Sequence, residues 1–151
     1  MLSSSRRDLV PALGASLFGG TVSVGYLLSS FDMLNVGDLG VIDRAAMLCD
    51  ELVVGVLTDE DVEFTMGRPP VIPQGERLEL VSHVRGVARA VSHTHGVEES
   101  ADLVLVHVDH SRLVDDLGTG VGVLVPEVET SSPILRSALR PARLVDSEAV
   151  A

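Results

Sequence analysis

Short apolar runs alternate along the chain with segments in which apolar residues recur at helical spacing. The runs are rich in Val and Leu, as expected of strands buried on both faces of a parallel sheet. Strands are predicted at 22–28, 52–57, 103–108 and 121–125, with a brief one at Val91. Helices are predicted at 38–49, 75–90, 111–117 and 131–139. This alternation predicts an α/β fold, a Rossmann-like doubly wound parallel sheet of about five strands with flanking helices.

Ligands bind sheets of this kind at the carboxyl ends of the strands. The loops in which to seek a binding site are therefore 29–38, 58–74, 107–111 and 126–132. The second of these contains Gly67, Pro69, Pro70 and Pro73, which predict a long loop without regular structure.

One domain is predicted over residues 21–140, between an N-terminal extension (1–20) and a C-terminal tail (141–151). Hydrophobic residues make up 46% of the chain, which is enough for one core, and an aromatic content of 3% makes that core aliphatic. Arg6-Arg7 before an apolar stretch is also typical of an export signal, but a proline and several glycines interrupt this stretch. We favour an extension, and no membrane span, because no segment reaches the ~20 uninterrupted apolar residues that a span needs.

The charge of the chain limits its partners. The formal net charge is −11, all eleven basic residues are arginines, and there is no lysine. This negative field argues against a nucleic-acid partner, which requires a basic surface. Cys49 is the only cysteine, so an intrachain disulfide is impossible and a reducing compartment is compatible. The chain is predicted to be cytoplasmic.

Four motifs follow one another in the first half of the chain. The loop after the first predicted strand reads S-F-D-M-L-N-V-G-D at 30–38, and the second strand ends in T-D-E at 58–60. M-G-R-P-P-V-I-P at 66–73 and E-R-L at 76–78 come next. This order resembles the HxGH nucleotidyltransferases, and within them the glycerol-3-phosphate cytidylyltransferases, whose pattern is T-F-D-x-x-H-x-G-H, T-D-E, K-G-R-P-P-V-I-P and E-R-L. The resemblance covers roughly residues 22–92, about half of the chain.

The sequence departs from the family pattern at the residues that carry its chemistry. Asn35 and Asp38 stand in place of the two motif histidines, and Met66 stands in place of the lysine. In the family, the histidines stabilise the charge that develops at the α-phosphorus, assisted by the helix N-terminus behind them. Asp38 brings a negative charge instead, and two unit charges about 4 Å apart repel by about 4 kcal/mol at an effective dielectric of ~20.

Weak or absent nucleotidyl transfer is therefore predicted, because the loss of even one oxyanion donor typically lowers a rate about 100- to 1000-fold. Both replaced positions also have a structural interpretation. Asp38 is suited to cap the helix that follows it, and Asn35 is suited to be a turn residue that has lost any ligand.

The resemblance also implies a nucleotide site built from loop residues. Its expected members are Ser30, Phe31, Gly37, Asp59, Arg68, Arg77, Thr130, Ser131 and Ser132. The last three echo the family's S-T-T motif, and N–H groups at the start of a helix are suited to bind phosphate. Structural alternatives stay open for several of them: a solvated helix position for Arg77 and a loop arginine without a ligand for Arg68. Asp59 is also suited to cap a turn, and residues 130–132 are suited to cap the helix that follows them.

Three residues with acid–base side chains gather at the end of one predicted strand. His107, Asp109 and His110 fall at the carboxyl edge of the sheet and are assigned to catalysis, with chance clustering as the alternative. The same cluster is compatible with a metal ion, and His93 with His95 is compatible with a weak one, but no metal site is assigned.

Three hypotheses for function stay open. The first is a degenerate cytidylyltransferase-like protein with weak or no nucleotidyl transfer, which binds a nucleotide or another small phosphorylated molecule. The second is an enzyme with different chemistry in the same cleft. The third is an active cytidylyltransferase with atypical residues, for which the resemblance implies CTP, Mg²⁺ and release of pyrophosphate. The resemblance also favours a homodimer.

Overall fold

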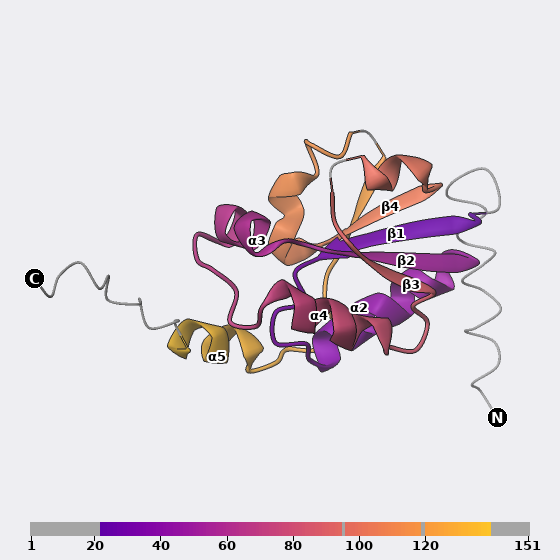
Figure 1. The fold of residues 1–151 in the computed structure, drawn as a ribbon. Helices are drawn as coiled ribbons and strands as arrows, with labels where there is room; N and C mark the ends of the chain where they lie inside the picture. The colour runs from indigo at the N-terminus through magenta and orange to yellow at the C-terminus, as the bar shows by residue number, and fades with distance from the viewer. Residues whose placement is uncertain (1–21, 95, 119, 140–151) are drawn as a thin grey trace, which may run out of the picture.

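A single parallel sheet organises the described residues, which are 22–94, 96–118 and 120–139 of the computed structural model. Its strands are β1 (Val24–Ser29), β2 (Glu51–Val56), β3 (Arg89–Ser92), β4 (Leu103–His107) and β5 (Val121–Leu124). The order is β3-β2-β1-β4-β5, and every neighbouring pair is parallel (Figure 1). The predicted Rossmann-like fold is confirmed. The predicted extension, the predicted tail and His95 lie outside the described residues.

Helices cover both faces of this sheet (Figure 1). One face packs against α2 (Val36–Met47) and α4 (Gln74–Ser82). The opposite face packs against α3 (Asp59–Met66) and the 3₁₀ helix η2 (Val108–Leu113). The remaining helical elements are η1 (Val97–Ser100) and α5 (Ser132–Ala138). In the described part of the chain, no helix has the length and apolar character needed to cross a bilayer.

The core consists of two apolar clusters, one on each face of the sheet. Successive side chains of a strand point to opposite faces. Leu27 of β1 therefore packs in a cluster with Ile42 of α2, whereas its neighbour Leu28 packs in a cluster with Val62 of α3. All four side chains are buried. Burial on both faces explains why the strands appear in the sequence as uninterrupted aliphatic runs.

Helix α3 corrects the prediction of an unstructured loop at 58–74. Thr58 caps the helix, because its hydroxyl accepts a hydrogen bond from the N–H of Asp61 at 3.1 Å. The acidic residues 59–61 fill the first turn, where the helix dipole favours negative charge. Gly67 ends the helix in the left-handed conformation, with φ of 71°. The glycine and prolines that suggested a loop thus begin only where α3 stops.

Three other boundaries differ from the prediction. Helix α2 begins at Val36 rather than at 38, and α4 ends at Ser82 rather than at 90. Gly86, with φ of 92°, lies in the turn after α4, and residues 89–92 join the sheet as β3. In place of a helix at 111–117, the chain forms η2 at Val108–Leu113.

Replacement of Gly55 by Ala is expected to destabilise the fold by about 1–3 kcal/mol, the usual range for overpacking a core. A Cβ atom at Gly55 of β2 would overlap the ring of Tyr26 on β1. That ring cannot move aside easily, since it is buried and its hydroxyl is hydrogen-bonded to His93 Nδ1 at 2.8 Å. Urea unfolding measures the loss. Gly75→Ala is the matched control, because open space surrounds Gly75 in α4; equal effects of the two changes would contradict the prediction.

Candidate functional site

The N-terminus of α2 is closed by two residues, Asn35 and Asp38. Asn35 is the N-cap, and its Oδ1 accepts hydrogen bonds from the N–H groups of Gly37 at 2.9 Å and Asp38 at 3.2 Å. In return, Asp38 Oδ2 accepts hydrogen bonds from the backbone N–H of Asn35 at 3.1 Å and from its Nδ2 at 2.9 Å. This reciprocal arrangement is a capping box. The cap is therefore Asn35, which corrects the interpretation of Asp38 as the cap and of Asn35 as an unattached turn residue.

The carboxyl group of Asp38 is buried, and burial disfavours its ionised form. Asp38 is only 7% exposed, and its Oδ1 lies 3.6 Å from His107 Nε2. Burial raises the pKa of Asp38 to about 6, and the nearby carboxylates of Asp109 and Asp32 add to the rise. The Asn35 N–H and the Arg136 charge act in the opposite direction but are weaker. Asp38 therefore changes charge close to neutral pH.

His107 ends β4 beside this carboxylate. Its Nδ1 accepts a hydrogen bond from the N–H of Asp109 at 3.2 Å, so the proton of the neutral ring lies on Nε2. That Nε2 is buried and has no hydrogen-bond partner. Burial lowers the pKa of His107, an effect that the Asp109 carboxylate opposes and that Arg136 and Arg44 reinforce. The imidazole is therefore mainly neutral at pH 7.

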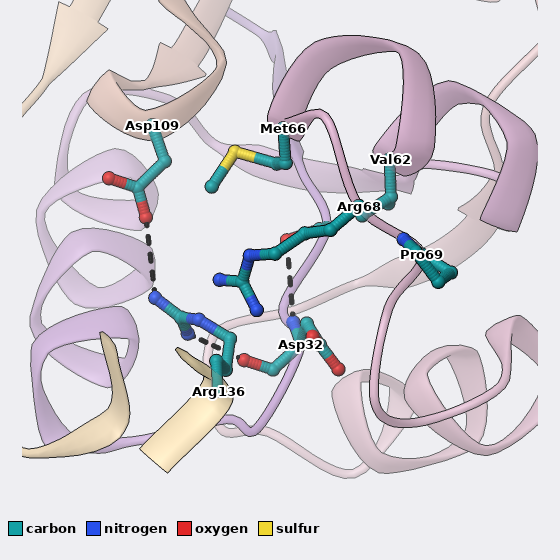
Figure 2. A pocket seen from close by; sticks show the side chains of 8 residues that line it. Asp32, Val62, Met66, Arg68, Pro69, Asp109 and Arg136 are labelled. Carbon is teal, nitrogen blue, oxygen red and sulfur yellow. Dashed lines mark hydrogen bonds and ion pairs between the residues drawn. The ribbon is translucent and has the colours of Figure 1, made fainter. Parts of the chain in front are cut away.

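Arg136 of α5 is a site residue that the sequence analysis did not select. Its Nη1 donates to the carbonyl oxygen of Asp32 at 2.7 Å, and its Nη2 lies 3.7 Å from Asp109 Oδ2 (Figure 2). Its Nε is buried without a hydrogen-bond partner. Two features of the sequence could have indicated it. Arg136 follows the T-S-S motif, and it lies one helical turn beyond Ser132, so both residues occupy the buried face of α5.

These residues line one cleft with a volume of about 460 Å³ at the carboxyl edge of β4 and β5. The predicted site residues that it brings together are Asn35, Asp38, His107, Asp109 and Thr130. Gly37 lies at its edge, where an added Cβ would come within 3.2 Å of the Val128 carbonyl oxygen. Arg136 completes the lining as its one cation among the described residues.

Ser30 and Arg68 line a neighbouring small cavity that shares Asp109 and Arg136 with the cleft. Figure 2 shows the Arg68 guanidinium pointing into this space, beside Met66. The cavity thus brings together Met66 and Arg68, two residues of the M-G-R-P-P segment. The role of Arg68 as an anion ligand stays a prediction.

His110 lies outside the cleft. Its Nε2 accepts a hydrogen bond from the N–H of Ser30 at 3.3 Å, and its Nδ1 is 3.1 Å from the hydroxyl of Thr65. Because that hydroxyl donates to the carbonyl of Asp61 at 2.8 Å, it accepts from His110. Burial lowers the pKa of His110 to about 4. This fully paired ring joins β1 to α3, which is a structural position and not the predicted catalytic one.

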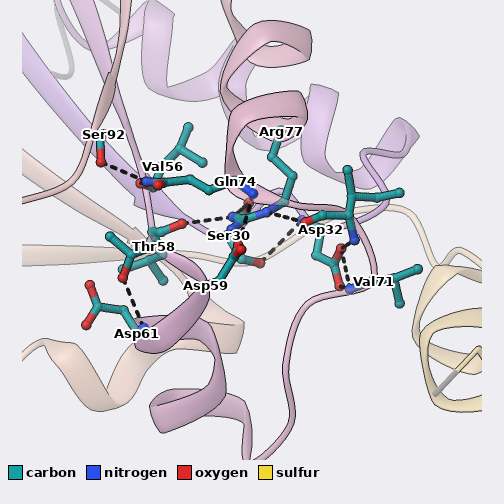
Figure 3. A network of polar contacts seen from close by, with 12 residues as sticks. Ser30, Asp32, Val56, Thr58, Asp59, Asp61, Val71, Gln74, Arg77 and Ser92 are labelled. Carbon is teal, nitrogen blue, oxygen red and sulfur yellow. Dashed lines mark hydrogen bonds and ion pairs between the residues drawn. The ribbon is translucent and has the colours of Figure 1, made fainter. Parts of the chain in front are cut away.

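Arg77 is likewise a structural residue in this arrangement, with no exposed surface. Its Nη1 donates to the carbonyl oxygens of Ser30 at 2.7 Å and Leu57 at 2.9 Å, and its Nε donates to that of Ile72 at 2.8 Å (Figure 3). Its Nη2 contacts Asp59 Oδ1 at 2.6 Å. The guanidinium therefore holds three segments of the chain together. Arg77 is thus neither an anion ligand, as predicted, nor a solvated helix residue, as in the alternative interpretation.

Asp59 and Asp32 hold the segment that follows α3. Asp59 Oδ1 also accepts from the N–H of Gln74 at 2.9 Å, and the Asp32 carboxylate accepts from the N–H groups of Val71 and Ile72 (Figure 3). These contacts favour the alternative interpretation of Asp59, as a capping residue, over its interpretation as a ligand of the nucleotide. Both carboxylates are occupied by the protein itself.

The other predicted binding residues take structural places as well. Phe31 is buried in the core at a positive φ of 51°, in the turn after β1. Ser131 precedes α5 as its N-cap without a side-chain capping bond, and Ser132 is buried in the first turn. Among the described residues, no group of three or more His, Cys, Asp or Glu side chains is arranged to hold a metal ion.

Comparison with known proteins agrees with this fold. A family model described as "Cytidylyltransferase-like" matches residues 26–130. An ethanolamine-phosphate cytidylyltransferase of Arabidopsis thaliana is 39% identical over 67 residues, which are 44% of this chain and 16% of that protein. An FAD synthase of Pyrococcus abyssi is 39% identical over 110 residues, 73% of this chain and 67% of that protein. An FAD synthase of Pyrococcus horikoshii is 38% identical over 74 residues, 49% of each chain.

A solved structure agrees with the fold. The lipopolysaccharide core biosynthesis protein of Thermoplasma volcanium superimposes with a TM-score of 0.56 at 22% identity, over 72% of this chain and 99% of that one. At that identity the likeness concerns the fold alone. The matches span from 16% to 67% of the lengths of the three sequence relatives. The family model, by contrast, covers most of the described residues: it begins within β1, at residue 26, and includes α2 and its capped N-terminus. The chain therefore belongs to the cytidylyltransferase-like family of nucleotidyltransferases.

Proposed function

We propose that this chain binds a small molecule in the cleft beside α2 and has weak or no nucleotidyl transfer activity. The observation that carries the proposal is the capping box. Asn35 Oδ1 occupies the N–H groups of Gly37 and Asp38, which a phosphate would otherwise use at a helix N-terminus. The Asp38 carboxylate adds negative charge at the same place. Neither residue can supply the cationic imidazole that the family uses on the triphosphate.

The charges around the cleft support the same proposal. Asp38, Asp109 and Glu129 line the cleft, and Arg136 is the one cation that the described part of the chain places there. Above pH 6 a triphosphate would therefore meet more negative than positive charge. Arg77, the other predicted anion ligand, is held by backbone carbonyls and Asp59. A smaller ligand with fewer charges fits these surroundings better than CTP with Mg²⁺ does.

A pyrophosphate-release assay tests the proposal on the full chain. CTP with Mg²⁺ is paired with glycerol 3-phosphate or ethanolamine phosphate, and ATP with Mg²⁺ is paired with FMN, because the relatives include a cytidylyltransferase and FAD synthases. We expect no pyrophosphate above background for any pair. Clear turnover by the unaltered chain would refute the proposal and favour an active transferase with atypical residues.

Restoring the motif should recover activity. The triple variant Asn35→His, Asp38→His, Met66→Lys is expected to release pyrophosphate at least about 100-fold faster than the unaltered chain, since each oxyanion donor is typically worth about that factor. The matched control, Asn35→Ser with Asp38→Glu, keeps a capping box but adds no imidazole, and it should stay inactive. Equal rates for the two variants would show that the replaced histidines are not what limits transfer.

A second candidate function is an enzyme with different chemistry in the same cleft. Its support is the contact of 3.6 Å between Asp38 Oδ1 and His107 Nε2, where a carboxyl with a raised pKa faces an imidazole with a lowered one. Pairs of this kind are suited to exchange protons with a substrate near neutral pH.

Assembly and location stay predictions. A homodimer is supported by exposed apolar side chains on α5 and on the segment before it. Among them, Ile134 is 73% exposed, Val125 is 54% exposed and Val128 is 52% exposed. The cytoplasm stays the predicted location.

A further inference from the structure

We propose that the cleft binds one singly charged oxyanion between His107 and Arg136, and that Asp38 takes up a proton when the anion binds. The inference rests on the proposed function, because it places a small ligand where the family places a triphosphate. It names the chemical class of that ligand and the condition under which it binds.

Two residues that line the cleft each have a buried side-chain N–H group that lacks an acceptor. These groups are Nε2 of His107 and Nε of Arg136, and both residues line the same space. His107 is 3% exposed and Arg136 is 8% exposed. A buried donor without a partner is unfavourable by about 1–3 kcal/mol, so two in one cleft indicate that something else satisfies them. Both are donors, and the missing group must therefore present oxygen acceptors.

The Arg136 guanidinium makes an anion the natural acceptor. It is the one cation in the lining of the cleft among the described residues, and Asp109 lies 3.7 Å from its Nη2 without a hydrogen bond. Asp109 and Glu129 also line the cleft, so an anion of the lowest charge meets the least repulsion beside Arg136. A carboxylate or a sulfonate-like tetrahedral group presents two or more oxygens, enough for an arginine N–H and an imidazole N–H together.

Asp38 determines when such an anion can enter. Its Oδ2 is held by Asn35, while its Oδ1 is 3.6 Å from the His107 N–H that the anion would use. An ionised Asp38 would repel the anion and compete for that donor. A protonated Asp38 has no charge, and its O–H becomes a third donor toward the same place.

Every element around Asp38 contributes a group to this balance. Asn35 faces it from its own helix, His107 and Asp109 from the end of β4, Arg136 from α5, and Asp32 from the turn after β1. Burial outweighs these contributions and raises the pKa of Asp38 to about 6. Because the pKa lies near neutrality, proton uptake makes binding strongly dependent on pH. The apparent dissociation constant should rise about tenfold per pH unit above 6, and about 100-fold in all between pH 5 and pH 8.

The test is a titration of the full chain followed by NMR chemical shifts at pH 5 and pH 8, at constant ionic strength. The probes are methanesulfonate, which is tetrahedral, and trifluoroacetate, which is planar; both stay singly charged at either pH. Sulfate is the doubly charged comparison. We expect one or both monoanions to bind about 100-fold more weakly at pH 8, and sulfate to bind more weakly than methanesulfonate. The stronger of the two monoanions distinguishes a sulfonate-like or phosphate-like group from a carboxylate.

Three variants test which residues bind the anion and which residue causes the pH dependence. Asp38→Asn should bind the monoanion with a dissociation constant that changes less than about threefold between the two pH values. His107→Gln should weaken binding at both values but keep the pH dependence, which excludes His107 as the titrating group. Arg136→Gln should abolish binding. Arg89→Gln is the matched control, because Arg89 is an exposed arginine at the amino end of β3, paired with Glu51.

The inference would be overturned if neither monoanion bound at pH 5, or if binding did not change with pH. It would also be overturned if the Asp38→Asn variant kept the full pH dependence, or if the Arg136→Gln variant bound the monoanion normally. If Arg136→Gln does not fold by its thermal melt, His107→Gln and Asp38→Asn decide. Pyrophosphate release would refute the proposed function whatever the anions do, whereas a failed titration in an inactive chain refutes this inference alone.

Discussion

Replacement of Arg77 by Met is expected to lower the free energy of unfolding by about 3–5 kcal/mol, as is usual when one partner of a buried charged network is removed. The guanidinium is fully buried and donates to the carbonyl oxygens of Ser30, Leu57 and Ile72. Each of those carbonyls follows a different element, so Met would leave all three without their donor. The free energy of urea unfolding at pH 7 measures the effect.

Two controls separate the role of Arg77 from that of charge alone. Arg89→Met removes an exposed arginine whose pair with Glu51 spans 3.7 Å, and it should change stability by less than about 1 kcal/mol. Asp59→Asn removes the charge of Arg77's partner, whose side chain is 51% exposed, and it should have a small effect for the same reason. A loss below about 1 kcal/mol for Arg77→Met itself would contradict a structural role and return Arg77 to the anion ligands.

Replacement of Asp38 by Asn is expected to make the protein relatively more stable as the pH rises. The folded pKa of about 6 lies above the unfolded value of 3.8, so the native state holds the extra proton between these values. Stability due to Asp38 therefore falls as the pH increases through that window. The Asp38→Asn variant has no carboxyl group at this position and so does not lose stability in this way. Its stability relative to the unaltered chain should improve by about 2 kcal/mol between pH 4.5 and pH 8.

Urea unfolding of both proteins at several pH values gives this difference directly. His110, whose lowered pKa makes the fold less stable in acid, titrates in both proteins and cancels from the comparison. Asn can also keep the hydrogen bond from the Asn35 N–H through its side-chain oxygen. A stability difference that does not change with pH would show that Asp38 has an ordinary pKa in the folded chain.

The fold could be predicted from the sequence because its signals are local. Uninterrupted Val and Leu runs indicate strands buried on both faces, and those runs became β1, β2, β4 and β5 with boundaries shifted by at most a few residues. Helix α3 was missed although Thr58 and the acidic residues after it are a helix start, because the prolines beyond Gly67 dominated the interpretation.

The site could be predicted only in part, because its geometry depends on contacts distant in sequence. His107 and Asp38 are 69 residues apart, and only the pairing of β1 with β4 brings them within 3.6 Å. Whether Arg77 faces solvent, a ligand or three carbonyls is decided by segments that no local pattern specifies. A helix arginine usually lies on the surface, and the burial of Arg136 depends on its contact with Asp32, 104 residues away in the sequence.

Arg136 has one more consequence, for the closing helix. It hydrogen-bonds the Asp32 carbonyl, and it is one of the few side chains that α5 buries, since Ile134, Leu135 and Leu139 are all largely exposed. The residue that we propose as the anion ligand is thus also the residue that holds α5 in place. If the anion binds there, occupancy of the cleft and local unfolding of α5 are thermodynamically linked, and amide hydrogen exchange in α5 reports whether the cleft is filled.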